Sequence, residues 1–213
     1  GQAARADLDL DDLVCDGAIG RILAKLKQYP DISYLYVNHS LWHPREVPKP
    51  SLLPSDIAAL GQPRNPDLTD LQVSELAELI PGDPNCFTPI YCSVIRRSLA
   101  AAAYEGCAKD IPFSTIESVF PHAKYIAENL IHKPALYIGQ PCVLSSSHTT
   151  WGNFWPITVL YLYPLLYDCF ERSGASHSVI DRHRRFMLTY SARPLNRLLA
   201  NSDVPLRSQF SLG

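Results

Sequence analysis

The chain has 213 residues, of which 46% are hydrophobic and 19% are charged, and its formal net charge at pH 7 is −2. This apolar content is sufficient for a folded core and excludes a largely disordered or low-complexity chain. The near-neutral charge excludes a general attraction to nucleic acid, so we expect no nucleic-acid partner, and six cysteines are too few for a disulfide scaffold.

Residues 1–42 are predicted to form an N-terminal unit of one helix and one strand. Apolar side chains recur at helical spacing through residues 11–28, and Pro30 ends that pattern. Residues 32–38 are β-branched and aromatic, which is typical of a strand. Aspartates interrupt the first apolar stretch, so it does not resemble a secretory signal. We therefore expect free thiols and an intracellular protein, with a mitochondrial or other organellar location after removal of a targeting sequence as one alternative.

Residues 43–66 are predicted to be an extended, proline-rich linker. Proline lacks an amide donor and fixes φ, so repeated prolines prevent a regular helix or sheet. The six prolines of this segment are Pro44, Pro48, Pro50, Pro54, Pro63 and Pro66. We expect an irregular segment that wraps a neighbouring surface and does not fold by itself.

Residues 67–213 are predicted to be the main domain, and most of it is expected to be helical. The predicted helices cover residues 69–80, 88–106, 115–120, 121–132 and 194–200. Residues 135–144 predict a strand, and residues 178–190 have a mixed pattern. The predicted fold class is therefore mostly α with a few short strands, an α+β fold with an irregular proline-rich segment.

A long segment of the main domain carries no charge. Residues 134–167 contain no Asp, Glu, Lys or Arg, and residues 154–167 are apolar on every side of a helix. Such a helix is either buried in protein or in contact with lipid, and its apolar length is at or just below what a bilayer core requires. The alternatives are a buried core helix, which we favour, a membrane-embedded or interfacial segment, and a pair of buried strands.

Charge and aromatic content predict an interaction surface in the second half of the chain. Residues 111–213 contain nine Lys and Arg against six Asp and Glu, whereas residues 1–110 contain ten against fifteen. A basic surface is either simply solvated or docks an acidic partner, a lipid headgroup or an RNA backbone. The candidate interaction residues are Trp151, Phe154, Trp155, Tyr161, Tyr163, Arg182, Arg184 and Arg185.

One short segment carries a candidate catalytic residue. Residues 81–87 read Pro-Gly-Asp-Pro-Asn-Cys-Phe and lead into a predicted helix, whose dipole would stabilise a thiolate. The last five of these residues resemble the Asp-Gly-Asn-Cys-aromatic motif of ovarian-tumour-type deubiquitinases, and viral papain-like leader proteases also have an aromatic residue after the cysteine. The resemblance implies that Cys86 is a nucleophile with His148 or His177 as its general base. The alternative is a buried, inert cysteine beside a turn.

We expect no metal and no cofactor. His39 and His43 are four residues apart, but the preceding pattern is extended and a proline follows, and Cys86 and Cys92 are not spaced like zinc ligands. No glycine motif for phosphate or dinucleotide binding occurs. The sequence therefore favours a non-catalytic accessory subunit of a larger, organellar and membrane-associated assembly. Its expected partners are other protein subunits, with lipid contact at residues 154–167, and the alternative function is a papain-like cysteine protease.

Overall fold

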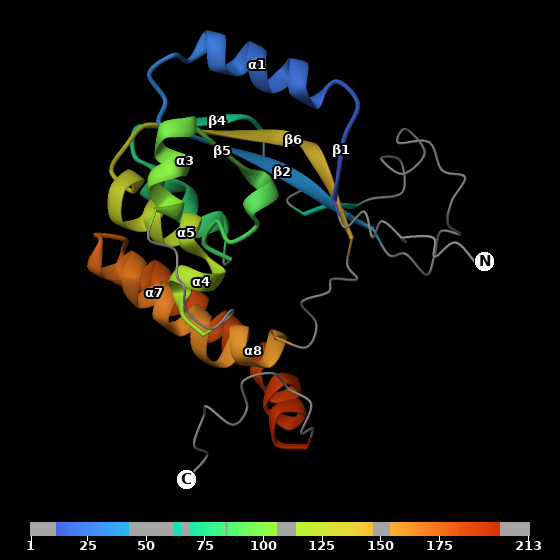
Figure 1. Ribbon diagram of the computed structural model, residues 1–213, viewed down its shortest axis with the longest axis vertical. Coiled ribbons are helices and arrows are strands. Elements are labelled where there is room, and N and C mark those ends of the chain that lie inside the picture. The colour runs from blue at the N-terminus through green and yellow to red at the C-terminus, as the bar shows by residue number, and fades with distance from the viewer. Residues whose placement is uncertain are drawn as a thin grey trace, which may run out of the picture.

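Two long parallel strands, β2 (Tyr34–Trp42) and β6 (Ala135–Ser146), lie side by side at the centre of a mixed sheet (Figure 1). The computed structural model describes residues 12–42, 62–64, 69–83, 85–105, 114–146 and 154–200. Short antiparallel strands flank this pair: β4 (Leu71–Val73) and β1 (Asp12–Val14) pair with β6, and β5 (Ser93–Ile95) and β3 (Gln62–Pro63) pair with β2. Both central strands are therefore hydrogen-bonded along both edges, which suits their β-branched and aromatic sequences.

The two central strands change register at a bulge in β6. Between Val37 and His39 of β2, the facing residue on β6 advances by five positions instead of two. Asn38 occupies the gap, and its side-chain amide donates a hydrogen bond to the Gly139 carbonyl at 2.8 Å. The Gly139 amide in turn donates to the Asp70 carboxylate at 3.0 Å. Side-chain hydrogen bonds thus replace the ladder bonds that the bulge removes.

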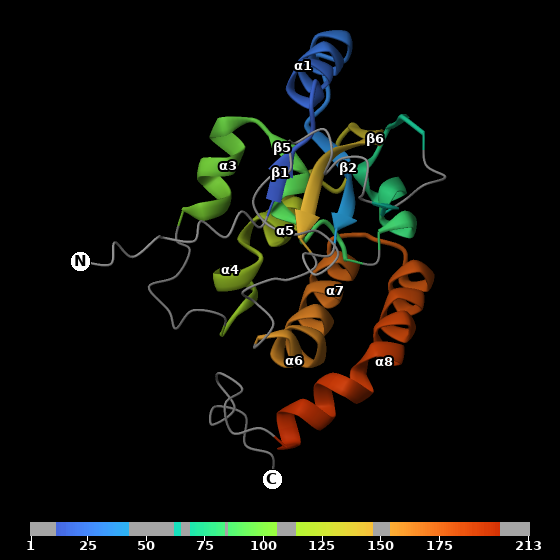
Figure 2. The same ribbon diagram turned by 90° about the vertical axis from the view of Figure 1, so that its right-hand side faces the viewer.

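Helix α1 (Ala18–Gln28) and the helix pair α7 (Tyr163–Arg172) and α8 (His177–Ala200) lie at opposite ends of the molecule, and shorter helices lie beside the sheet between them (Figures 1 and 2). The other helical elements are η1 (Leu76–Gly82), η2 (Ile90–Cys92), α3 (Arg97–Tyr104), α4 (Ile116–Val119), α5 (Pro121–Tyr125), η3 (Ile126–Leu130), α6 (Trp155–Ile157) and η5 (Thr158–Leu162). The mostly helical α+β fold class is confirmed.

The last part of the charge-free segment, residues 155–167, lies in a helix that packs into the chain's own core, whereas its first part forms β6. Residues 155–172 run through α6, η5 and α7 without a break, and most of their side chains are buried, with Leu162, Leu166 and Phe170 inaccessible to solvent. The favoured prediction of a buried helix is confirmed, and the prediction of two buried strands is wrong. Among the described residues, no helix is long and apolar enough to cross a membrane.

Three predicted helices are in part strands, and the first, residues 11–28, contains β1 (Asp12–Val14) before α1 begins at Ala18. Residues 69–80 contain β4 before the short helix η1, and residues 88–106 contain η2 and β5 before α3. Leu71–Val73 and Ser93–Ile95 are β-branched or apolar segments that pair with β6 and β2, and this pairing outweighs the local helical pattern. The helices predicted over 115–120 and 121–132 are confirmed as α4, α5 and η3, with Thr115 and Ser118 forming a capping box.

The last described element is one helix where two segments were predicted. Helix α8 has 24 residues and contains Pro194, which the sequence prediction treated as the start of a separate helix. Proline removes one hydrogen bond from a helix interior and bends it without necessarily ending it. Figure 2 shows that α8 is bent along its length.

One hydrophobic core spans the predicted units. Leu35 and Val37 of β2 belong to residues 1–42, and they pack in the same core as Ile138 and Phe170 from residues 67–213. Of the proline-rich segment 43–66, the structure describes residues 62–64, where β3 pairs with β2. The rest of the predicted wrapping segment lies outside the described residues.

Candidate functional site

The motif around Cys86 forms a tight turn that a buried aspartate holds in place. Cys86 and Phe87 have φ values of 47° and 61°, and the Thr88 amide donates to the Asn85 carbonyl at 3.1 Å. The Asp83 carboxylate accepts hydrogen bonds from the amides of Asn85 at 3.0 Å and Phe87 at 2.8 Å. Left-handed backbone at a residue other than glycine costs about 1–3 kcal/mol, so these two bonds stabilise a strained turn.

Cys86 itself is fully buried within this turn. Its neighbour Phe87 packs edge-on against Tyr34 and Tyr36 and lies 6.1 Å from the ring of Phe170, which places the turn inside the core. Burial raises the pKa of the Cys86 thiol well above its usual value, and the nearby Asp83 raises it further. The thiol is therefore neutral near pH 7, which is opposite to the state that a nucleophilic cysteine requires.

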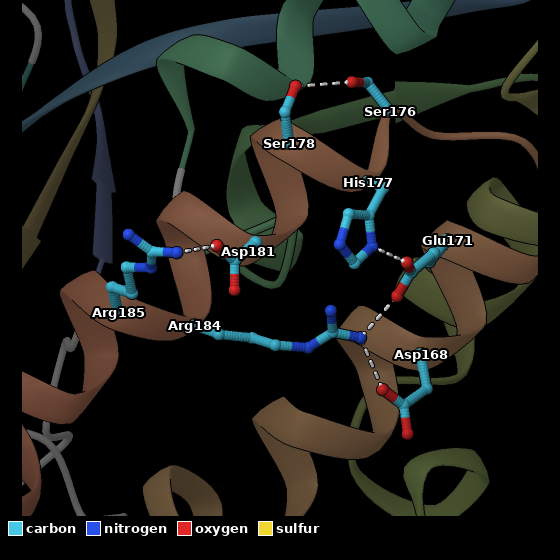
Figure 3. Close-up of polar contacts among 8 residues, drawn as sticks. All are labelled: Asp168, Glu171, Ser176, His177, Ser178, Asp181, Arg184 and Arg185. Atoms are coloured by element: carbon cyan, nitrogen blue, oxygen red, sulfur yellow. Dashed lines mark hydrogen bonds and ion pairs between the residues drawn. The ribbon is translucent and has the colours of Figure 1, made fainter.

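Of the two histidines predicted as a general base for Cys86, the structure describes only one. His177 is the first residue of α8, its side chain is 77% exposed, and its Nδ1 hydrogen-bonds the Glu171 carboxylate (Figure 3). No hydrogen bond joins His177 to the buried Cys86, so the structure does not bring these two residues together as nucleophile and base. His148 lies outside the described residues, and its pairing with Cys86 stays a prediction.

A different cysteine and histidine are in contact in the core. The Cys92 Sγ lies 3.3 Å from His39 Nδ1, and both side chains are buried. Burial raises the pKa of Cys92 well above its usual value, and burial, with a smaller effect of Arg64, lowers the pKa of His39 to about 4. Both groups are thus neutral near pH 7, and they form a hydrogen-bonded pair without a thiolate–imidazolium ion pair.

These two residues lie 53 positions apart in the sequence, and their contact was not predicted. The sequence suggested His39 only as a metal ligand with His43, which lies outside the described residues. Their contact results from the pairing of β5 with β2, where Ser93 faces Tyr36, and no local motif records that pairing. Among the described residues, no group of three or more His, Cys, Asp or Glu side chains is arranged to hold a metal ion.

A very small polar cavity lies between β2 and the Asp83 turn. Its volume is about 10 Å³, and it is lined by Tyr36, Val37, Asn38, His39, Arg64, Gly82, Asp83 and Asn85. A cavity of this size is at the lower limit for one water molecule. It offers polar partners to a water, but it cannot admit a peptide or a cofactor.

The predicted arginines on α8 are largely neutralised within the chain. The Arg184 guanidinium donates to Asp168 and to Glu171 of α7, both at 2.6 Å, and Arg185 pairs with Asp181 at 2.6 Å (Figure 3). Arg182 is exposed. The basic character that the sequence indicated for this region is therefore reduced by acidic neighbours.

The predicted aromatic contacts divide between surface and core. Trp155 and Tyr161 are 44% and 39% exposed, and Phe154 is half-buried. Tyr163 is buried, and its hydroxyl hydrogen-bonds Thr88 at 3.0 Å, so its prediction as an interaction residue is corrected to a core position. Trp151 lies outside the described residues.

One side of helix α8 is buried against the rest of the chain, and exposed apolar side chains lie on both flanks of that buried side. Ile180, His183 and Met187 are buried at helical spacing against the rest of the chain. We use the name α8 apolar face for the exposed leucines of one flank, which are Leu188, Leu195 and Leu199; Phe186 and Tyr190 are exposed on the other flank. The apolar surface of α8 is thus wider than the part that this chain covers.

These exposed side chains were not predicted as a surface because Pro194 was taken as the start of a separate helix. The signal is present once residues 177–200 are treated as one helix, since Leu188, Leu195 and Leu199 then fall on one side of it. Comparisons with protein-family models, with curated proteins and with solved structures found no match. Function is therefore interpreted from the geometry of the chain itself.

Proposed function

We propose that this protein is a non-catalytic subunit of a larger protein assembly and docks onto a partner protein through the α8 apolar face. The observation that carries the proposal is the exposure of large apolar side chains along one helix, including Leu188 at 69% and Leu199 at 51%. Single exposed apolar residues are ordinary, but a group on one helix marks an interaction site more often than a solvated surface.

The charge arrangement next to this face supports an apolar interface. Arg184 is bonded to two carboxylates on α7, and Arg185 to one on its own helix, so neither is an isolated cation. The cores of protein interfaces contain few charged residues and are enriched in aromatic side chains and methionine, whereas charged residues lie at the rim. Phe186 and Tyr190, whose ring centroids lie 5.0 Å apart, are exposed on the other flank of the helix and lie outside the α8 apolar face.

The surroundings of the thiols support a role other than catalysis. Cys86 and Cys92 are both buried, and burial holds the pKa of each thiol above its usual value. The cavity beside His39 and Asp83 has room for one water at most. The organellar location and the lipid contact expected from the sequence stay predictions.

A pair of matched substitutions tests the docking proposal. Leu195→Lys places a charge on the α8 apolar face, and Asn196→Lys places the same charge at the next, exposed polar position. Each variant is expressed as a tagged full chain in the source cells, and the stoichiometric subunits that co-purify are quantified. We expect Leu195→Lys to lose the partner while Asn196→Lys retains it. Retention of the same partner by both variants would contradict the proposed face.

A further inference from the structure

We infer that Cys15 and Cys142 are a site of reversible disulfide formation that links β1 to β6. The two strands are antiparallel, and Val14 faces Val143, so the next facing pair is Cys15 and Cys142. The Cys15 amide donates to the Cys142 carbonyl at 2.9 Å, which continues the ladder to this pair. Both cysteines have free thiols in this structure.

The geometry of facing residues in an antiparallel ladder suits a cross-strand bridge. Side chains of a facing pair lie on the same side of the sheet, and the Cα atoms of facing pairs lie about 4.5–5.5 Å apart. That separation is within the range of about 4.4–6.8 Å in which disulfides form without backbone movement. Burial raises the pKa of Cys15, and the proximity of Cys142 raises it further.

The two sulfur atoms differ in access, which sets the order of reaction. Cys15 is half-buried at the end of an edge strand, whereas Cys142 is fully buried. Burial raises the pKa of the Cys142 thiol, and the hydrogen bond from the Arg21 guanidinium, 4.0 Å from the Cys142 Sγ, partly opposes this shift. Arg21 therefore favours the thiolate of Cys142, the form needed to attack a neighbouring disulfide.

The reaction requires an external oxidant, which we take to be a low-molecular-weight disulfide such as oxidised glutathione. The Cys15 thiolate attacks one sulfur of that disulfide, forms a mixed disulfide and releases one thiolate. The Cys142 thiolate then attacks the Cys15 sulfur, forms the internal bond and releases the second thiolate. The protons of the two protein thiols pass to the two released thiolates, so the protein is oxidised by two electrons and the glutathione disulfide is reduced by two.

The bond would fix the start of α1 to the centre of the sheet. Strand β1 has three residues, and α1 begins three residues after Cys15. In the reduced chain a short edge ladder and the Arg21 contacts hold this region to β6. A covalent link at the end of that ladder would close a long loop of the chain and restrict the unfolded state.

Oxidation of the full chain with oxidised glutathione tests the inference. The reduced protein is incubated, alkylated and digested without reduction, and the linked peptides are identified by mass spectrometry. We expect the count of free thiols to fall from six to four and a peptide pair joining Cys15 to Cys142. The oxidised chain should also unfold at a higher urea concentration than the reduced chain.

Three variants make the result specific. Cys142→Ser should stop at one glutathione attached to Cys15, and Cys15→Ser should form no internal bond. Cys169→Ser removes a buried thiol from α7 and should form the same link as the wild type. A wild-type chain that accumulates glutathione on Cys15 without closing the bond, or that links a different pair, would overturn the inference.

Discussion

The buried His39 should make the stability of this protein depend on pH. Burial lowers its pKa from 6.5 to about 4, so the folded state disfavours the imidazolium that the unfolded chain forms readily. Below about pH 6.5 the unfolded chain binds a proton that the folded chain does not bind, and the free energy of unfolding must fall as the pH falls. This loss proceeds down to about pH 4, where folded His39 is itself protonated and the loss ends.

The size of this loss of unfolding free energy follows from the difference between the pKa values of His39 in the unfolded and the folded chain. The distance from 6.5 to about 4 corresponds to roughly 3 kcal/mol of unfolding free energy at the acid end. This amount is a large fraction of the stability of a typical domain. Burial also lowers the pKa values of His122 and His183, which act in the same direction as His39, whereas the raised pKa values of buried Asp83 and of His132 beside Glu75 act in the opposite direction.

Urea unfolding at several pH values between about 7.5 and 4 measures this effect. His39→Gln should reduce the slope of unfolding free energy against pH, whatever its own stability at neutral pH. Cys92→Ala is the matched control, because it removes the hydrogen-bond partner of His39 but not the burial that lowers the histidine pKa, and it should keep the slope. Parallel curves for the wild type and His39→Gln below pH 6.5 would refute the reasoning.

Three further substitutions or reactions test local features of the fold. Asp83→Ala should lower the free energy of unfolding by about 3 kcal/mol, because two amides lose their acceptor, and Asp83→Asn by about half as much in the same urea titration. Gly174→Ala should lower it by about 1–2 kcal/mol, since Gly174 has φ 106° and an added Cβ would lie 2.7 Å from His132 Nε2; thermal unfolding measures this. Iodoacetamide should alkylate Cys15 faster than Cys86 near neutral pH, and preferential labelling of Cys86 would restore its candidacy as a nucleophile.

Segments with a strong local pattern were predictable from the sequence. Residues 135–144 and 32–38 carry β-branched and aromatic side chains, and they form the two central strands. The apolar residues 154–167 predicted a buried helix because no charged side chain there required solvent, and residues 155–167 lie in one. In each case the segment is buried in the folded chain, and its sequence is apolar because buried positions require apolar side chains.

Features that depend on pairing between distant segments were not predictable. The strand Ser93–Ile95 has no turn signal to separate it from α3, and only its pairing with β2 reveals it. The same register places Cys92 beside His39, and the register of β1 on β6 places Cys15 opposite Cys142. A single sequence records neither register. The α8 apolar face was hidden for a local reason, because Pro194 was taken as a boundary.

Sedimentation velocity of the purified full chain over a range of concentrations tests the central claim most directly. If the α8 apolar face is a docking surface, the wild-type chain without its partner should self-associate as its concentration rises. Leu195→Lys should remain monomeric, and Asn196→Lys should behave like the wild type. A wild-type chain that stays monomeric at every concentration, indistinguishable from Leu195→Lys, would contradict the account.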